Sequence, residues 1–242
     1  LQTDAGQLAT GRYDYTVETT ANYFGSSTTT SSSGTVTIIN EESSPFGEGW
    51  TLTEGVSGEW SVVSGNLFNR LHVVTGGVIL NQGAGNSLWF AGSGPNYTTP
   101  AGDFSTLTFN AMNSTYTRTL KDGTKQIFNS AGMQTSLIDR NNQTITFAYI
   151  DADSDGSIDE LSTITDSNGL VTTLAYPGTC GAGVSPARVC TITDPAGRVT
   201  AMRAVRHDDQ EVEVRVDGRV AARLRAEQDD LHRVALLDED PE

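Results

Sequence analysis

The sequence predicts an all-β fold in which antiparallel β-hairpins share one continuous sheet. Three similar segments, 137–149, 164–176 and 192–202, follow one another at nearly equal intervals. Within each segment apolar and polar residues alternate on both sides of a turn signal, which is the period of a β-strand. An isolated two-stranded hairpin is marginal in water, so repeated hairpins must cover one another.

The turn of each copy is marked by an aspartate and by a second residue three positions later. The aspartate can accept hydrogen bonds from amides two residues on, and the second position tolerates a left-handed backbone only as glycine or asparagine. Each copy is therefore expected to be strand, turn and strand. The pairs are Asp139 with Asn142, Asp166 with Gly169, and Asp194 with Gly197.

The second strand of the first two copies ends in large side chains at alternate positions. Phe147 and Tyr149 fall on one face of their strand, and Leu174 and Tyr176 fall on the corresponding face of theirs. Stacked hairpins would therefore carry aromatic rungs along one side of the sheet.

The turn and tyrosine pattern of these copies resembles the units of the RHS or YD repeat proteins. The resemblance extends upstream to 44–50, Ser-Pro-Phe-Gly-Glu-Gly-Trp, to the hairpin segments 77–80 and 88–90, and to 100–107, and it covers roughly 44 to 202. It implies a long sheet curved into a hollow shell, in secreted or surface-displayed bacterial proteins. Some members of the family enclose a C-terminal toxin, so an enclosed toxin domain is one expected partner.

Residues 1–43 are expected to form a lead-in with strands at Arg12–Thr19 and Thr35–Asn40. The Ser, Thr and Gly stretch from Gly25 to Gly34 between them predicts a flexible loop. Two strands are too few for a sandwich. The piece is therefore either part of a β-sandwich, which we favour, or a lead-in that pairs with the shell.

Three further regions follow the lead-in. Residues 44–130 are expected to hold the shell-opening hairpins, among them one turned at Asp122-Gly123, a strong hairpin signal. Residues 131–202 hold the repeats, interrupted by an acidic insertion at 151–160 and a cysteine-flanked one at 180–190. Residues 203–242 form a charged tail.

The tail permits two structures. Val212, Val214 and Val216 alternate before Asp217-Gly218, and alternation resumes after it, which favours degenerate hairpins without tyrosines. An amphipathic helix from Ala221 to Ala235 is the alternative, because Ala, Arg, Leu and Glu favour helices.

The acidic insertion has the D-x-D-x-D-G form of a calcium loop. Alternate carboxylates can converge on one hard cation, and Gly156 permits the sharp turn. Position twelve is Ser162 rather than glutamate, so Asp159 or Glu160 would have to complete the ligand set. A solvated acidic turn is the alternative. The predicted ligands of calcium are Asp151, Asp153, Asp155, Ser157, Asp159 and Glu160.

The two cysteines, Cys180 and Cys190, flank a short loop and are expected to form a disulfide. Such a bridge would stabilise a loop of this size by roughly 2.7 kcal/mol in the chain-entropy model. It would also indicate an oxidising compartment. Two thiols without a role are the alternative, and the spacing does not suit a metal site.

Composition restricts the partners. The net charge of −15 opposes binding to nucleic acid, and no apolar run approaches the length of a membrane helix. The start at Leu1, without an initiator methionine or signal region, predicts a piece of a larger precursor. The resemblance to RHS and YD repeats implies that this precursor is a secreted or cell-surface bacterial protein.

No catalytic constellation is evident. The histidines, His72, His207 and His232, lack ligand spacing, and no pair of carboxylates stands out for hydrolysis. The sequence therefore predicts a non-enzymatic scaffold that encloses or contacts a partner. A calcium-dependent adhesion or carbohydrate-binding module is the alternative, with a hydrolase as a third hypothesis. An aromatic sugar platform would use Trp50, Trp60, Trp89 and Tyr97, although core packing explains these residues better.

Overall fold

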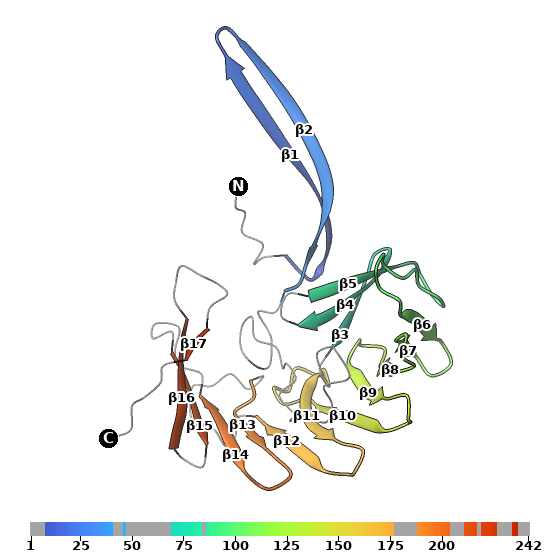
Figure 1. Ribbon diagram of the computed structural model, residues 1–242, viewed down its shortest axis with the longest axis vertical. Helices are drawn as coiled ribbons and strands as arrows, with labels where there is room; N and C mark the ends of the chain where they lie inside the picture. Colours follow the sequence, from blue (N-terminus) through green and yellow to red (C-terminus); the bar gives the residue numbers. More distant parts are fainter. Residues whose placement is uncertain are drawn as a thin grey trace.

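The computed structural model describes residues 8–40, 46, 69–83, 86–176, 188–203, 211–216, 219–226 and 234–236. These residues form seventeen strands and no helix, so the predicted all-β fold is confirmed (Figure 1). None of them belongs to a helix long and apolar enough to cross a bilayer.

The strands are organised in three antiparallel sheets. The first sheet is a hairpin of β1 (Gly11–Tyr23) and β2 (Ser26–Ile38), and the second is a meander of β3 (Arg70–Val74), β4 (Gly77–Gly83) and β5 (Asn86–Ala91). The third is a large sheet of twelve strands. Its strands are β6 (Thr106–Asn110), β7 (Thr115–Thr119), β8 (Lys125–Phe128), β9 (Gln134–Ile138), β10 (Thr144–Ile150), β11 (Glu160–Thr165), β12 (Val171–Ala175), β13 (Thr191–Thr193), β14 (Val199–Arg203), β15 (Glu211–Val216), β16 (Arg219–Ala226) and β17 (Val234–Leu236).

In the large sheet every strand pairs with the strands that precede and follow it in the chain. The sheet bends into an arc that runs along the right and lower side of Figure 1, from β6 to β17. The large sheet starts at Thr106. It continues without interruption past position 130, the predicted boundary between the shell-opening hairpins and the repeats. Beyond position 203 the described residues are strands and not helix, as the alternation of valines favours.

One turn geometry recurs between the strands. In the three copies the amide of Asp139, Asp166 or Asp194 donates to the carbonyl four residues later, at 2.9–3.0 Å. Each Oδ1 accepts from the amides two and four residues on, at 2.8–2.9 Å. The residue three positions on has a positive φ, as predicted from Asn142, Gly169 and Gly197.

Two further turns share this backbone geometry although the repeat pattern does not mark them. Leu120 donates to Thr124 and Asn129 donates to Met133, with positive φ at Gly123 and Gly132. The first of them is the predicted Asp122-Gly123 hairpin. Five turns therefore follow one backbone plan. Four of them are held by an aspartate, which in the first of these two turns is Asp122, and the last is held by Asn129.

Successive turns alternate between the two rims of the large sheet, because consecutive strands are antiparallel. The turns that begin at Asp139, Asp166 and Asp194 lie on one rim. The opposite rim carries the turn 129–133, the acidic loop between β10 and β11, and the segment with Cys190 that leads into β13. The two insertions predicted from the sequence are thus on the same rim.

The repeat part of the sheet, β10 to β14, buries the large side chains expected to form rungs. Phe147, Leu174 and Tyr176 belong to one core cluster, against which Tyr149 packs. The Tyr149 hydroxyl donates to the Gln134 carbonyl at 2.7 Å, and the Tyr176 hydroxyl donates to the Leu161 carbonyl at 2.9 Å. Each tyrosine reaches the backbone fifteen residues earlier, which ties neighbouring hairpins together.

The first strands of the large sheet, β6 to β9, pack against the three-stranded sheet. Leu71, Val78, Leu80 and Phe90 from the small sheet form one buried cluster with Leu107, Tyr116 and Phe128 from the large sheet. At the joint the Leu71 amide donates to the Gly132 carbonyl at 2.8 Å, and Arg70 forms a bridge with Met133. We call β6 to β9 the covered part.

The β1–β2 hairpin corrects one prediction. Residues 26–34 are strand and not a flexible loop, because thirteen pairs run without a break to a turn at Phe24-Gly25. Threonine has a high strand propensity, and Gly25 supplies the positive φ of the turn. Among the described residues this hairpin is a two-stranded sheet of its own, joined to neither other sheet. A facing sandwich layer is not seen there.

Candidate metal-binding site

The acidic insertion forms a tight loop on the rim of the sheet between Ile150, which ends β10, and Glu160, which begins β11. The loop is folded by its own carboxylates. Asp151 accepts from the amides of Asp155 and Gly156 at 3.1 and 3.2 Å, and Asp153 also accepts from Asp155. Ser154 and Gly156 have a positive φ, which lets the chain reverse twice within six residues.

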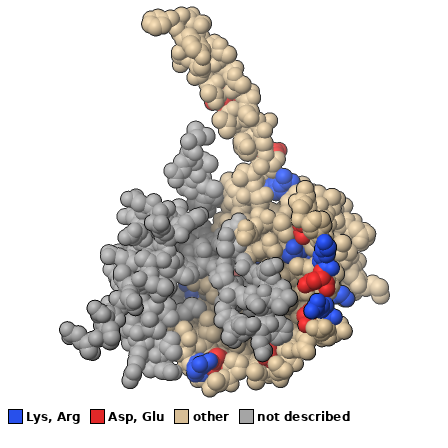
Figure 2. Space-filling view, viewed as in Figure 1, with Lys and Arg blue, Asp and Glu red and all other residues tan. Residues whose placement is uncertain are grey.

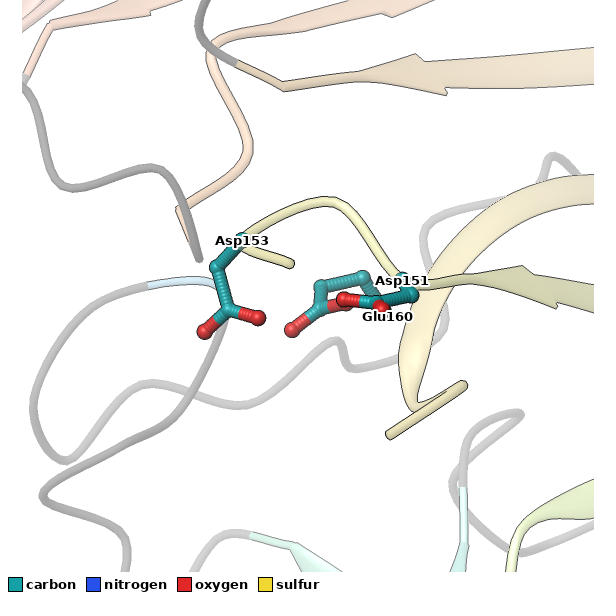
Figure 3. A group of neighbouring side chains, drawn as sticks. All are labelled: Asp151, Asp153 and Glu160. Carbon is teal, nitrogen blue, oxygen red and sulfur yellow. The ribbon is translucent and has the colours of Figure 1, made fainter. Parts of the chain in front are cut away.

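Three of the predicted ligands come together. One ligand oxygen each of Asp151, Asp153 and Glu160 lies within 4.8 Å of the others, and Figure 3 shows the three carboxylates facing a common space. Oxygen ligands surround calcium at about 2.4 Å, so two of them can be separated by up to ~4.8 Å. The spacing is therefore wide enough for one cation between the three.

Glu160 is the buried residue of this group, at 5 % exposure. Burial raises its pKa, and the charges of Asp159 and Asp153 raise it further, whereas the amide of Ala152, which donates to Oε2 at 2.9 Å, opposes the shift. Its surroundings therefore disfavour the ionised form of the Glu160 carboxylate. A cation between the three carboxylates would favour it.

The other predicted ligands lie outside this group. The carboxylate of Asp155 is exposed and accepts from the Ser157 amide at 2.7 Å. Asp159 lies 3.7 Å from the Arg70 guanidinium on β3. Of the two residues expected to complete the set, Glu160 and not Asp159 joins the group, because residue 160 begins the strand and points to the buried side.

The acidic loop adjoins the joint between the two packed sheets. Arg70, which pairs with Asp159, precedes Leu71, whose amide bonds to Gly132. Burial raises the pKa of Tyr149, partly opposed by the charge of Arg70, and burial together with the charges of Glu160 and Asp159 raises the pKa of Tyr176. Both tyrosines are therefore neutral hydrogen-bond donors at any physiological pH.

The cysteine loop lies on the same rim. Cys190 is disulfide-bonded, and its amide donates to the Ala175 carbonyl at 2.8 Å. Cys180, its predicted partner, lies outside the described residues. The disulfide and this hydrogen bond together restrain the segment that leads into β13.

Two members of the predicted aromatic platform are involved in packing. The Arg12 guanidinium lies 4.6 Å from the centre of the Trp89 ring, whose edge would meet any Cβ at Gly77 at 2.5 Å. Tyr97 packs against Tyr116 with ring centres 6.2 Å apart, and burial raises its pKa to about 12. Trp50 and Trp60 lie outside the described residues.

The structure also contains a buried ionic group that the repeat pattern does not indicate. Arg118 is 4 % exposed and its guanidinium contacts Ser105 at 2.9 Å, Gln126 at 3.2 Å and Asp103 at 3.3 Å. Burial alone would raise the pKa of Asp103, but hydrogen bonds from Ser105 and the charge of Arg118 hold it below the usual value. The alternation of β7 places position 118 on the inward face. This alternation is the one feature of the sequence that could have predicted the burial of Arg118.

No family model matches the chain, and no curated protein is similar enough to count as a match. The resemblance to RHS and YD repeats therefore depends on the sequence motifs themselves.

Proposed function

We propose that this chain is a non-enzymatic scaffold, the wall of a shell in a secreted or cell-surface bacterial protein of the RHS/YD-repeat type. Its partner would be an enclosed C-terminal toxin domain or a surface carbohydrate or protein. The observation that carries the proposal is the curved sheet of twelve strands, paired in chain order. Such a sheet extends by adding hairpins and has an inner and an outer face, which is the geometry of an enclosing wall.

The tyrosine contacts support this role. In a wall made of repeats, each unit contacts only its neighbours, so contacts between units determine its stability. The Tyr149 and Tyr176 hydroxyls make such contacts with the preceding hairpins. The disulfide at Cys190 is consistent with an oxidising compartment outside the cytoplasm.

The scaffold is tested by electron cryomicroscopy of the natural protein that contains this chain. We expect the large sheet to continue as the wall of a hollow particle with a second domain or a partner inside. A solid particle with no enclosed space would contradict the proposal. A glycan array with and without EDTA distinguishes the scaffold from the alternative, a calcium-dependent adhesion or carbohydrate-binding module. Calcium-dependent retention of the protein on sugars would favour the alternative.

The second part of the proposal is that the acidic loop binds calcium. The support is the agreement between the D-x-D-x-D-G motif and the convergence of Asp151, Asp153 and Glu160. Calcium would neutralise these carboxylates and pin the loop on the rim, without changing the sheet.

Calorimetric titration with calcium tests this part, with magnesium as a second titrant. The wild-type chain is expected to release or absorb heat with one site, and Asp153→Asn is expected to lose that heat. Asp166→Asn is the matched control, because Asp166 sits in a turn on the opposite rim, outside the group. Equal heats for wild type and Asp153→Asn would end the calcium proposal and leave the scaffold untouched.

A further inference from the structure

The β1–β2 hairpin extends away from the rest of the molecule. Its thirteen residue pairs make a long ribbon that projects from the body in Figure 1. Most of its residues are exposed, including Tyr23 at 69 % and Phe24 at 110 % at the tip. A two-stranded ribbon of this kind is marginal in water, whereas three or more strands with a hydrophobic face can be stable.

The two faces of the ribbon differ in polarity. Tyr13, Tyr15 and Val17 alternate along β1, and Val36 stands opposite Tyr13 on β2, so these side chains share one face. Tyr15 is 47 % exposed and Val36 is 43 % exposed. The residues between them on β1, such as Asp14 and Thr16, form a polar face. The ribbon is thus an amphipathic sheet with too few strands to bury its apolar side.

The outer edge of β2 lacks the features that protect exposed strand edges. Protective devices include proline, lysine, inward charges and bulges. The segment 26–38 contains no proline and no charged residue, and its pairing with β1 shows no register shift. No described residue pairs with the outer edge of β2, so this edge offers its backbone groups to another strand of similar length.

We propose that the outer edge of β2 pairs with β2 of a second copy of this chain, antiparallel and around a two-fold axis. The product is a four-stranded sheet in which the corresponding faces of both ribbons lie on the same side. Two-fold pairing of identical strands is self-complementary, because each residue makes the same contact in both copies. Strand addition of this kind draws its affinity from main-chain hydrogen bonds.

Electrostatics favour this contact between copies over others. Each copy carries a net charge of −15, so contacts between bodies are repulsive. The strand that makes the contact, β2, contains no charged residue, and β1 contains three, Arg12, Asp14 and Glu18. Figure 2 shows the ribbon mostly uncharged on the face in view. Thirteen residues of strand span about 43 Å at 3.3 Å per residue, and antiparallel pairing would place the two bodies at opposite ends of that span. This separation exceeds the Debye length of about 8 Å at physiological salt several-fold, so the repulsion between bodies is screened.

Sedimentation velocity of the full chain, from micromolar to submillimolar concentration, tests the proposal with two lysine variants. Ser31→Lys places a charge near the centre of β2, opposite Glu18, where the opposite charge supports the hairpin within one copy. In the dimer the two lysines would meet near the axis. We expect the wild type to dimerise and Ser31→Lys to dimerise at least tenfold more weakly.

Thr16→Lys is the matched control, because it adds the same charge to the same face on β1, one strand away from the contact. It is expected to dimerise as the wild type does. A wild type that stays monomeric over the whole range overturns the proposal. So does a Ser31→Lys dimer as tight as the wild type, which would place the contact elsewhere. Circular dichroism of each variant checks that the strand content is unchanged.

Discussion

The covered part and the repeat part of the large sheet share strand pairing and turn geometry but differ in their inward side chains. In the covered part polar residues are buried: Arg118, Gln126 and Gln134 are all below 5 % exposure. In the repeat part the inward positions are leucine, isoleucine, phenylalanine and tyrosine. Among the described residues there, the buried polar exception is Glu160 at the acidic loop. The hairpin geometry therefore determines whether a side chain points inward. The residues packed against that face determine whether a polar or an apolar side chain can be buried there.

The same contrast applies to the turns. Gly132 and Gly169 occupy the same position of the recurring turn, both with a φ of 82°. A Cβ at Gly132 would lie 2.0 Å from the Leu71 carbonyl oxygen, whereas a Cβ at Gly169 would meet nothing within 4 Å. The turn at Gly132 therefore packs against the second sheet, whereas the turn at Gly169 only reverses the chain direction.

The largest effect is expected from alanine at these two glycines. Gly132→Ala should destabilise the protein by more than about 4 kcal/mol, because it adds a backbone collision at the joint to the cost of the left-handed conformation. Gly169→Ala should cost only about 1–2 kcal/mol, the conformational term alone. Urea unfolding of both variants measures the difference. Equal losses would show that the joint contributes little to stability.

The next effect concerns the buried ion pair of the covered part. Asp103→Ala should cost about 3 kcal/mol, because it leaves the buried Arg118 guanidinium without its counter-charge. The double variant Asp103→Leu with Arg118→Met should recover most of this loss. The folded-state pKa of Asp103 is lowered, so its contribution exists above 3.8 and is lost as pH falls through the folded value. Unfolding free energies measured from pH 6 downward should therefore fall less steeply in the double variant than in the wild type.

A smaller effect is expected in the repeat part. Tyr176→Phe removes the hydroxyl that bonds to the Leu161 carbonyl but keeps the ring in the core, and it should cost about 1 kcal/mol. Tyr116→Phe is the comparison, because Tyr116 is also buried but its side chain bonds to the Tyr97 side chain and not to the backbone of the preceding hairpin. Thermal unfolding of both variants tests the contact. A Tyr176→Phe protein as stable as the wild type would mean that the tyrosine contributes through its ring alone.

The smallest effect is expected at the acidic loop without metal. Because the folded-state pKa of Glu160 is raised, the native state binds the proton more tightly than the unfolded chain. The contribution of Glu160 to stability is therefore greatest below the unfolded pKa of 4.5 and is lost as pH rises through the folded value. Glu160→Gln should remove this decline and be slightly more stable than the wild type at neutral pH in EDTA. Added calcium should then stabilise the wild type and not the variant.

Much of the repeat part could be predicted from the sequence. The turns at Asp139, Asp166 and Asp194 depend on bonds within five residues, and the buried faces of β10 and β12 follow from alternation. The ribbon was predicted less well, because Ser, Thr and Gly in 25–34 are common in loops and also suit a twisted strand. In the candidate site the motif identified the loop and all the acids, but not which of them would meet.

The sequence by itself therefore determined the local units: strand period, turn positions and the carboxylate-rich loop, all of which depend on neighbours a few residues apart. Only the tertiary structure decided that Asp159 faces Arg70 while Glu160 faces the carboxylates of Asp151 and Asp153, that Arg118 is buried with Asp103, and that Gly132 meets Leu71. The physical reason is that the contacts of Asp159 with Arg70 and of Gly132 with Leu71 join segments distant in the chain, and that the burial of Arg118 depends on the residues packed around it. Their energies depend on which groups lose water when the sheets stack, and no local pattern records that.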